Sequence, residues 1–334
     1  DERGSRSVGP TPAPDRDLRP AGGTAANLRR RRAGTTGAAV VALLAPVERA
    51  ALTMRTLSCV VAHLVRRRAP TMHASTPPSG SPLGIAQALP PYREFVPFSP
   101  PRDGRAPLPL GTILCVRVTD TARDWPHVEA GVPALRARYP TAPVVLHFAH
   151  AATADAIHLA RHAAFLFVRA ILVDDEPVTP TLRRFLTQPV DLATDVVEWL
   201  PLRGVRVPPE CVPLIREVVR RAAVHRSVRD LLHAIGESEH NVRKRLHGRG
   251  LPAPGGWFAA ARAAHAALRL QSDTERTLLD IALDFGYSDH STLSRQMVRL
   301  FGLRPSVIRE TLGWEPLADR WIARAMDGGK TARV

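Results

Sequence analysis

Lysine is almost absent from this chain, which has only Lys244 and Lys330 beside 44 arginines in 334 residues. Cysteine is scarce as well, with three residues that stand far apart. Three separated cysteines give neither a disulfide framework nor a metal-ligand spacing, and they fit a reducing compartment. We therefore predict a cytoplasmic protein without structural disulfides.

Long uncharged hydrophobic runs are missing too. The most apolar stretches, residues 38–47 and 50–65, are separated or broken by Glu48, Arg49 and Arg55. Neither reaches the roughly 18 to 20 apolar residues that a membrane-spanning helix needs. We predict no membrane partner.

Common catalytic motifs are also absent, since the chain holds no G-x-S-x-G, G-x-G-x-x-G or Walker sequence and no Cys/His metal spacing. His147 and His150 flank the end of a predicted strand without a third ligand, and Cys115 lies inside one, where a core thiol is expected. We predict a non-enzymatic protein with no metal and no cofactor. An enzyme domain fused to a DNA-binding region stays open as an alternative.

Positive charge is abundant but unevenly spread. The formal net charge is +15, with 16 basic against 7 acidic residues in 1–108, 10 against 10 in 109–208, and 20 against 14 in 209–334. Basic side chains favour polyanionic partners because they displace counterions from phosphates. The preference for arginine over lysine also fits a GC-rich coding bias, so charge alone does not establish DNA binding.

Residues 1–108 are rich in Pro, Gly, Arg, Ser and Thr and show no helical or strand period. We predict a disordered, low-complexity basic segment whose deletion leaves the melting temperature of the remainder unchanged. Because Met54 and Met72 lie inside it, one hypothesis is a linker or sequence upstream of the natural start. The alternative is a basic arm, Arg29–Arg32 with Arg66–Arg68, that adds nonspecific DNA affinity.

Residues 109–207 alternate between two patterns. Short β-branched runs predict strands at 112–118, 143–148 and 170–173, and helices are expected at 128–138 (or from Pro133), 151–163, 181–187 and 192–200. Such alternation indicates parallel strands with helices on both faces of the sheet. We predict a small α/β regulatory domain.

Residues 208–325 predict an all-α domain, with helices at 211–225, 228–235, 240–246, 256–270, 278–284, 290–301 and 306–312. The stretch LLDIALDFGYSDHSTLSRQMVRLFGLRP (278–305) is the most informative. Gly286 can supply the positive φ of a tight corner, and Ser288 and Asp289 are good N-cap residues. Helical periodicity then buries one face and leaves the other to solvent; the outward residues are His290, Ser291, Ser294, Arg295 and Val298.

The string A-x-x-x-G-Y-S-D-x-S-x-L-S-R-x-M-x-x-x-F-G-x-x-P, from Ala282 to Pro305, closely resembles the second helix-turn-helix signature of AraC/XylS-type regulators. The resemblance implies two helix-turn-helix units joined by a long helix. Residues 228–246 would form the first unit, with Gly236 at its turn, and 256–270 the connecting helix. It implies a bacterial-type transcription regulator that binds double-stranded promoter DNA.

By this resemblance, the outward residues of two recognition helices enter successive major grooves. The expected DNA-binding residues are His240, Arg243 and Lys244 in the first helix, and His290, Ser291, Thr292, Ser294 and Arg295 in the second. Arginine can bond guanine O6 and N7, and hydroxyls reach bases or phosphates. Surface ion pairing of the arginines is the alternative.

The chain departs from the family pattern at several points. Glu237 and Glu239 stand at the first turn, the connection LPAPGG (251–256) is loose, and Leu293 and Met297 occupy positions where an aromatic is common. These departures leave the second unit as the stronger prediction.

The segment ILVDDEP (171–177) resembles a strand of phosphoacceptor receiver domains. As an opening strand it fails, because too few residues follow before the helical domain. As a third strand it places Asp174 at the acceptor position, but the first strand ends without an acidic pair and no lysine precedes Lys244. We predict a degenerate receiver-like domain that mediates a homodimer or senses an effector that the sequence does not identify. The alternative function is a pseudo-receiver interaction module with a weakened DNA-binding domain.

We predict that phosphorylation does not switch this protein. A working receiver needs Mg²⁺ held by acids from two strand ends, and an arginine is not equivalent to the lysine that pairs with the phosphate. Incubation with acetyl phosphate and Mg²⁺, followed by intact-mass measurement, should show no added phosphoryl group. A phosphoryl adduct that disappears in Asp174→Asn would contradict this prediction.

Overall fold

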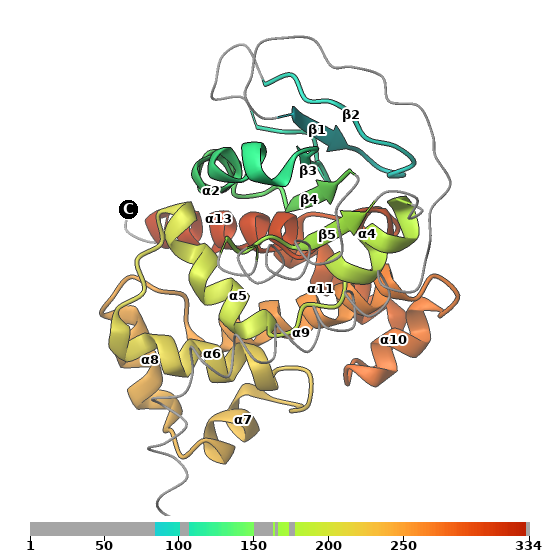
Figure 1. Ribbon diagram of the computed structural model, residues 1–334. Helices are drawn as coiled ribbons and strands as arrows, with labels where there is room; N and C mark the ends of the chain where they lie inside the picture. The colour runs from blue at the N-terminus through green and yellow to red at the C-terminus, as the bar shows by residue number, and fades with distance from the viewer. Residues whose placement is uncertain (1–83, 101–106, 150–162, 164–165, 174–177, 332–334) are drawn as a thin grey trace, which may run out of the picture. The chain divides into compact units, whose positions relative to one another are not determined.

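A five-stranded mixed sheet precedes a helical region in this computed structural model, which describes residues 84–100, 107–149, 163, 166–173 and 178–331. The strand order is β2-β1-β3-β4-β5 (Figure 1). The strands are β1 (Gly84–Ala88), β2 (Val96–Pro97), β3 (Ile113–Val118), β4 (Val144–Phe148) and β5 (Ala170–Val173).

Strands β3, β4 and β5 run parallel and confirm the three predicted strands. Helix α2 (Thr121–Arg138) covers one face of the sheet and helix α4 (Val178–Leu186) covers the other. Side chains alternate along β3, so Leu114 and Val116 pack on the α2 side, whereas Ile113 and Cys115 pack on the α4 side. The predicted small α/β unit with helices on both faces is confirmed.

Helix α2 begins earlier than the apolar spacing predicted. It starts at Thr121, not at residue 128 or Pro133. The carboxylate of Asp120 accepts a hydrogen bond from the backbone N–H of Arg123 at 3.1 Å and so satisfies a free amide of the first turn. The start signal is this cap, which lies outside the apolar repeat.

Residues 84–97 form two strands, so the prediction that they belong to a disordered segment was wrong. Strand β1 pairs antiparallel with β3 along its full length and with β2 on its other side. Ala88 and Tyr92 are fully buried in the sheet core. Five strand residues followed by Pro90 and Pro91 are too short a run to show a period against a proline-rich background.

The receiver-like resemblance is not confirmed, because antiparallel β1 and β2 extend the sheet beyond β3. The acidic cluster Asp174–Glu176 and most of the predicted helix 151–163 lie outside the described residues, as do residues 1–83.

The helical region follows β5 and α4. Its helices are α5 (Leu192–Trp199), α6 (Val212–Arg221), α7 (Val228–Ala234), α8 (Glu239–His247), α9 (Pro254–Ser272), α10 (Leu278–Asp284), α11 (His290–Phe301), α12 (Pro305–Glu310) and α13 (Glu315–Thr331), with short 3₁₀ turns η1 (Leu200–Arg203) and η2 (Pro209–Cys211). The eight helices from α5 to α12 confirm the predictions within a few residues. Helix α13 was not predicted.

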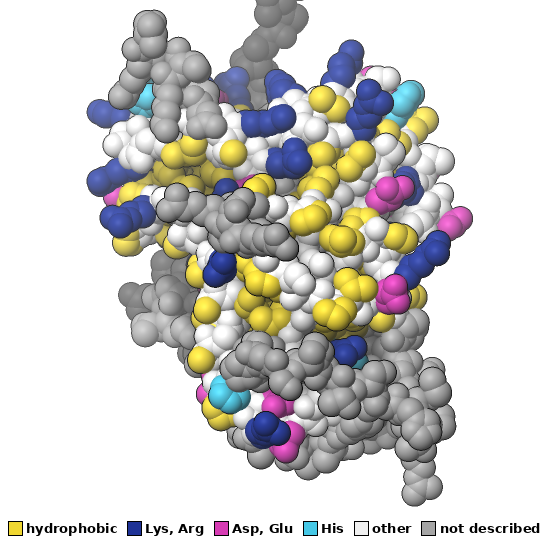
Figure 2. Space-filling model, turned by 90° about the horizontal axis from the view of Figure 1, so that it is seen from above, with side chains coloured by type: hydrophobic (Ala, Val, Ile, Leu, Met, Phe, Trp, Pro, Cys, Tyr) yellow, Lys and Arg dark blue, Asp and Glu magenta, His cyan; other side chains and the backbone are white. Residues whose placement is uncertain are grey.

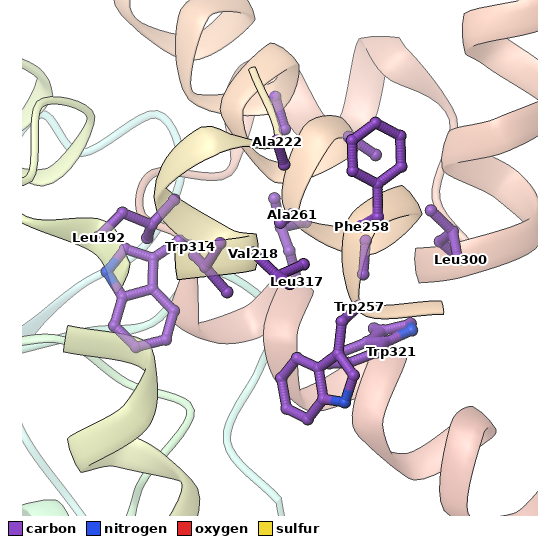
Figure 3. Close-up of a cluster of buried hydrophobic side chains, with 14 of the residues drawn as sticks. Leu192, Val218, Ala222, Trp257, Phe258, Ala261, Leu300, Trp314, Leu317 and Trp321 are labelled. Atoms are coloured by element: carbon purple, nitrogen blue, oxygen red, sulfur yellow. The ribbon is translucent and has the colours of Figure 1, made fainter. Parts of the chain in front are cut away.

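The alanine-rich helix α9 lies at the centre of the helical core. Trp257, Phe258 and Ala261 of this helix meet side chains of α6, α11 and α13 (Figure 3). The rings of Trp257 and Trp321 pack edge to face, with centroids 4.7 Å apart. Because alanine side chains are small, neighbouring helices can approach α9 closely, and large aromatic side chains fill the space at its start.

The loop between α12 and α13 joins the sheet to the helical core, and both belong to the unit formed by residues 50–334. Leu312 is buried in the sheet core, and its backbone N–H donates to the Tyr92 hydroxyl at 3.0 Å. Gly313 exchanges two hydrogen bonds of 3.1 and 3.2 Å with the side chain of Gln271, near the end of α9. Burial raises the pKa of Tyr92 to about 12, so the hydroxyl stays neutral.

Two largely buried ion pairs reinforce this junction. Arg169, directly before β5, contacts Asp195 of α5 at 2.5 Å and Glu315 of α13 at 3.0 Å. A buried guanidinium is tolerated only when it is paired, so these three side chains fix β5, α5 and the start of α13 to one another. The boundary between residues 207 and 208 stays a prediction, since α5 side chains already belong to the helical core.

We predict that a chain lacking residues 1–108 melts several degrees below a chain lacking residues 1–83. The larger deletion removes β1 and Tyr92, exposes the edge of β3 and leaves the Leu312 amide without its partner. In chains of this size about 2–4 °C is lost per 1 kcal/mol of stability. Thermal denaturation followed by circular dichroism measures the difference, and equal melting temperatures would restore the earlier expectation that residues 84–108 add nothing.

Candidate nucleic-acid interface

Two helix pairs in the helical region share one turn geometry. Helices α7 and α10 each have seven residues, and each is followed by a glycine with positive φ, 74° at Gly236 and 72° at Gly286. In both turns the residue after glycine, Glu237 or Tyr287, donates its N–H back into the helix at 2.9 Å. This left-handed closure reverses the chain tightly, so α7–α8 and α10–α11 are both helix-turn-helix units.

The second unit has a strongly capped recognition helix. The Asp289 carboxylate accepts from the backbone N–H of Thr292 and from the hydroxyls of Thr292 and Ser288, each at 2.8 Å. These hydrogen bonds, that of the Thr292 amide foremost, hold the pKa of Asp289 well below its usual range. Of the two predicted cap residues the helix uses Asp289, and Ser288 supports it.

Helix α11 separates its residues as the periodicity predicted. Leu293, Met297, Leu300 and Phe301 are buried against the core. His290, Ser291 and Arg295 are exposed, whereas Thr292 and Ser294 are half-buried. The five predicted residues therefore share the amino-terminal two turns of one helix.

The polar groups of α11 are organised by short-range bonds. The Ser294 hydroxyl donates to the backbone carbonyl of His290 at 2.8 Å, and Arg295 Nη2 donates to Thr292 Oγ1 at 3.3 Å. Within the described part of the chain, no carboxylate contacts Arg295. Its guanidinium is thus held near the start of the helix while its charge stays available.

Helix α13 fixes the other end of α11. Arg324 donates to the backbone carbonyls of Val298 and Arg299 at 3.1 and 3.2 Å, in the last turn of the helix, where carbonyls lack an intrahelical partner; the Val298 carbonyl also accepts from the Gly302 amide. Gly302 ends the helix with φ 67°, and a Cβ there would lie 2.1 Å from the Arg324 guanidinium. The sequence analysis missed this support because it did not predict α13.

The first recognition helix, α8, has a register that matches α11. Its buried residues Val242 and Leu246 are four residues apart, as are Leu293 and Met297. Aligning these pairs places Lys244 opposite Arg295, Arg243 opposite Ser294 and His240 opposite Ser291. All three predicted residues of α8 are exposed, so the structure brings each predicted set onto one helix face.

The charges of the first unit are largely paired. Arg243 contacts Glu239 at 3.1 Å, and Arg245 contacts the Glu237 carboxylate through both oxygens at 2.8 and 2.9 Å. Lys244 has no such carboxylate within the described residues. Among the residues that the structure describes, an acidic partner is therefore seen for Arg243 but not for Lys244.

Further side chains lie beside the predicted DNA-binding residues on this surface. Beside α8 a shallow groove of about 420 Å³ is lined by Glu210, Asn241, Lys244, Arg245, Gly248 and Arg249. On α11, Val298 is 44% exposed, and Arg299 is exposed beside it. The residue matching Val298 in α8 is His247. His247 and Val298 lie three residues after Lys244 and Arg295, and this helical spacing could have placed both on the same outward face.

The described residues contain no metal-binding cluster and no exposed cysteine. Cys115 is fully buried, and burial raises its pKa to about 12, which confirms a core thiol. His147 is in β4, and His150 lies outside the described residues. Among residues that the structure describes, no group of three or more His, Cys, Asp or Glu side chains could hold a metal ion. In the same residues, no helix is long and apolar enough to cross a bilayer.

Comparison with known proteins identifies one region. The family model described as a helix-turn-helix domain matches residues 217–311, from α6 to the end of α12. No curated protein and no solved structure matches the chain. The match covers both units and the connecting helix α9.

We predict that Gly302→Ala destabilises the protein more than Gly236→Ala. Both changes place a Cβ in the left-handed region, which costs about 1–2 kcal/mol. At Gly302 the Cβ also displaces Arg324 from the carbonyls of α11, whereas nothing lies within 4 Å of a Cβ at Gly236. Urea denaturation measures both losses, and equal losses would show that the Arg324 contact contributes nothing.

Proposed function

We propose that this chain, a DNA-binding transcription regulator whose residues 217–311 form an AraC-type helix-turn-helix domain, reads double-stranded DNA with two recognition helices, α8 and α11. The observation that carries the proposal is the common register of the two helices. Each has a polar outward face over two buried residues, and each presents one basic side chain, Lys244 or Arg295, at the same position. A helix fits the major groove, where base edges differ in their donors and acceptors.

The second unit is proposed to supply most of the base discrimination. Arg295 can donate two hydrogen bonds to guanine O6 and N7, while Ser291, Thr292 and Ser294 offer hydroxyls to neighbouring bases or phosphates. His290 lies at the first position of the helix, where residues meet the groove floor or the flanking phosphates. The cap at Asp289 and the Arg324 contact support this role because both hold α11 at its ends.

The first unit is proposed to contribute less. Before Arg243 can bond a base it must leave Glu239, and the nearby carboxylates of Glu237 and Glu239 repel phosphates. Lys244 is a compact ammonium on a flexible stem, which suits a phosphate or a guanine but lacks the planar fork of arginine. His240 adds an imidazole donor or acceptor at the helix start.

The sheet region is proposed to carry the regulatory role, through a homodimer or an unidentified effector. Support comes from its exposed face on the side of β1 and β2, where hydrophobic side chains gather among arginines (Figure 2). Leu89 and Val96 of this hairpin are 38% and 39% exposed. The alternative is an interaction module in which the helix-turn-helix domain has lost DNA binding.

The test is binding of the full-length chain to DNA sequences selected by the wild-type protein, measured by fluorescence anisotropy at several salt concentrations. Arg295→Ala is expected to cost about 1–3 kcal/mol and to relax base choice at one position. Lys244→Ala should weaken binding in the other half of the site, and Arg243→Ala should cost less than either. Arg93→Ala removes an exposed arginine outside residues 217–311 and should change little.

Two outcomes would contradict the proposal. If the wild-type chain binds no DNA even at about 50 mM salt, where phosphate contacts are strongest, the interaction-module alternative holds. If Arg295→Ala and Arg93→Ala weaken binding equally and leave base preference unchanged, Arg295 acts only as a generic positive charge.

A further inference from the structure

Arg262, in the middle of α9, contacts the turn of the second helix-turn-helix unit. Its guanidinium carbon lies 4.7 Å from the ring centroid of Tyr287 and 5.0 Å from that of Phe258. Tyr287 follows Gly286 in the turn before α11 and is 6% exposed. Since a cation near an aromatic face gains energy as water is excluded, this contact favours one position of the turn relative to α9.

The same guanidinium also contacts the first unit. Arg262 Nη1 donates to the backbone carbonyl of Arg226 at 3.0 Å. Arg226 directly precedes Ser227, the N-cap residue of α7, whose hydroxyl accepts from the Asp230 amide at 3.1 Å. One side chain therefore touches the start of the first unit and the turn of the second, although the two lie 61 residues apart in sequence.

These contacts differ from the packing around them. Apolar contacts along α9 hold the units together without fixing their direction, whereas a hydrogen bond and a cation–π contact depend on orientation. Arg262 also has a fixed base, because α9 is buried on both sides of it, at Ala261 and Ala263. A shift of either unit along α9 would break one of its contacts.

We propose that Arg262 is a positioning residue that sets the separation of α8 and α11, and thereby selects the spacing of the two half-sites on DNA. This inference rests on the proposed two-helix function. One inserted base pair rotates the second half-site by about 35° around the duplex. Two units held at a fixed separation cannot follow that rotation, and units that can shift relative to each other lose less.

The experiment compares a selected DNA site with the same site carrying one inserted or one deleted base pair between its halves. The wild-type chain is expected to lose at least about tenfold in affinity on the altered sites, as for a mismatched contact. Arg262→Met keeps the length of the stem and removes the guanidinium. On the altered sites the Arg262→Met variant should lose less than about threefold in affinity, a smaller loss than one mismatched contact causes. Its affinity for the isolated α11 half-site should stay unchanged.

The matched control is Arg269→Met on the same helix. Arg269 is exposed and pairs with Asp273 at 3.6 Å, so its removal should leave the wild-type discrimination intact. Arg262→Lys provides a second variant in case the methionine variant does not fold. The lysine ammonium can contact either the Arg226 carbonyl or the Tyr287 ring but lacks the planar guanidinium. We therefore expect it to discriminate between half-site spacings less than the wild type and more than Arg262→Met.

Two results would overturn the inference, and they are distinguishable. If the wild-type chain discriminates between spacings and both Arg262 variants discriminate equally well, Arg262 does not set the spacing. If the wild-type chain binds all spacings alike and needs only the α11 half-site, the two-helix reading itself fails, and the inference fails with it.

Discussion

Both helix-turn-helix units depend on the burial of α9. The helix is 19 residues long, and five of its seven alanines, Ala260, Ala261, Ala263, Ala266 and Ala267, are buried in the helical core. Alanine has the highest helix propensity and the smallest side chain that can pack, so this sequence favours a straight rod with close neighbours on all sides. Each unit then has a fixed wall to pack against, and the recognition helices turn their remaining faces outward.

The segment between α12 and α13, together with the start of α13, carries several of the contacts that link the sheet to this arrangement. Leu312 is inserted into the sheet core, Gly313 holds the end of α9, and Glu315 pairs with Arg169. The same helix α13 that begins at Glu315 carries Arg324, which holds the end of α11. Helix α13 therefore contacts the start of the edge strand β5 through Glu315 and the end of α11 through Arg324. Because Leu312 and Gly313 are held by hydrogen bonds, a displacement of β5 must move α13 as well or break one of these bonds.

Sequence reasoning predicted most of the helical region because its signals are local. The spacing of Leu293 and Met297, the cap at Asp289 and the glycine at 286 each act within a few residues, and the structure agrees with all three. Strand β1 and helix α13 escaped prediction because their stability comes from distant partners. Tyr92 needs Leu312 and Arg324 needs the carbonyls of α11, contacts that no local pattern announces. The spacing of four residues between Glu239 and Arg243 allowed an ion pair on one helix face, but the sequence could not decide whether Arg243 forms that pair.

The two helix-turn-helix units differ in which groups their acidic side chains bond. In α11 the acidic residue stands at the N-cap, where it bonds the Thr292 amide, and no carboxylate among the described residues contacts Arg295. In α8 serine occupies the cap, and the acids at 237 and 239 bond arginines instead. A carboxylate at the cap stabilises the helix through its amides, whereas one turned toward a neighbouring arginine offsets the charge of that arginine. The same residue type therefore caps α11 and pairs with arginines of α8, according to whether its partner is a backbone amide or a guanidinium.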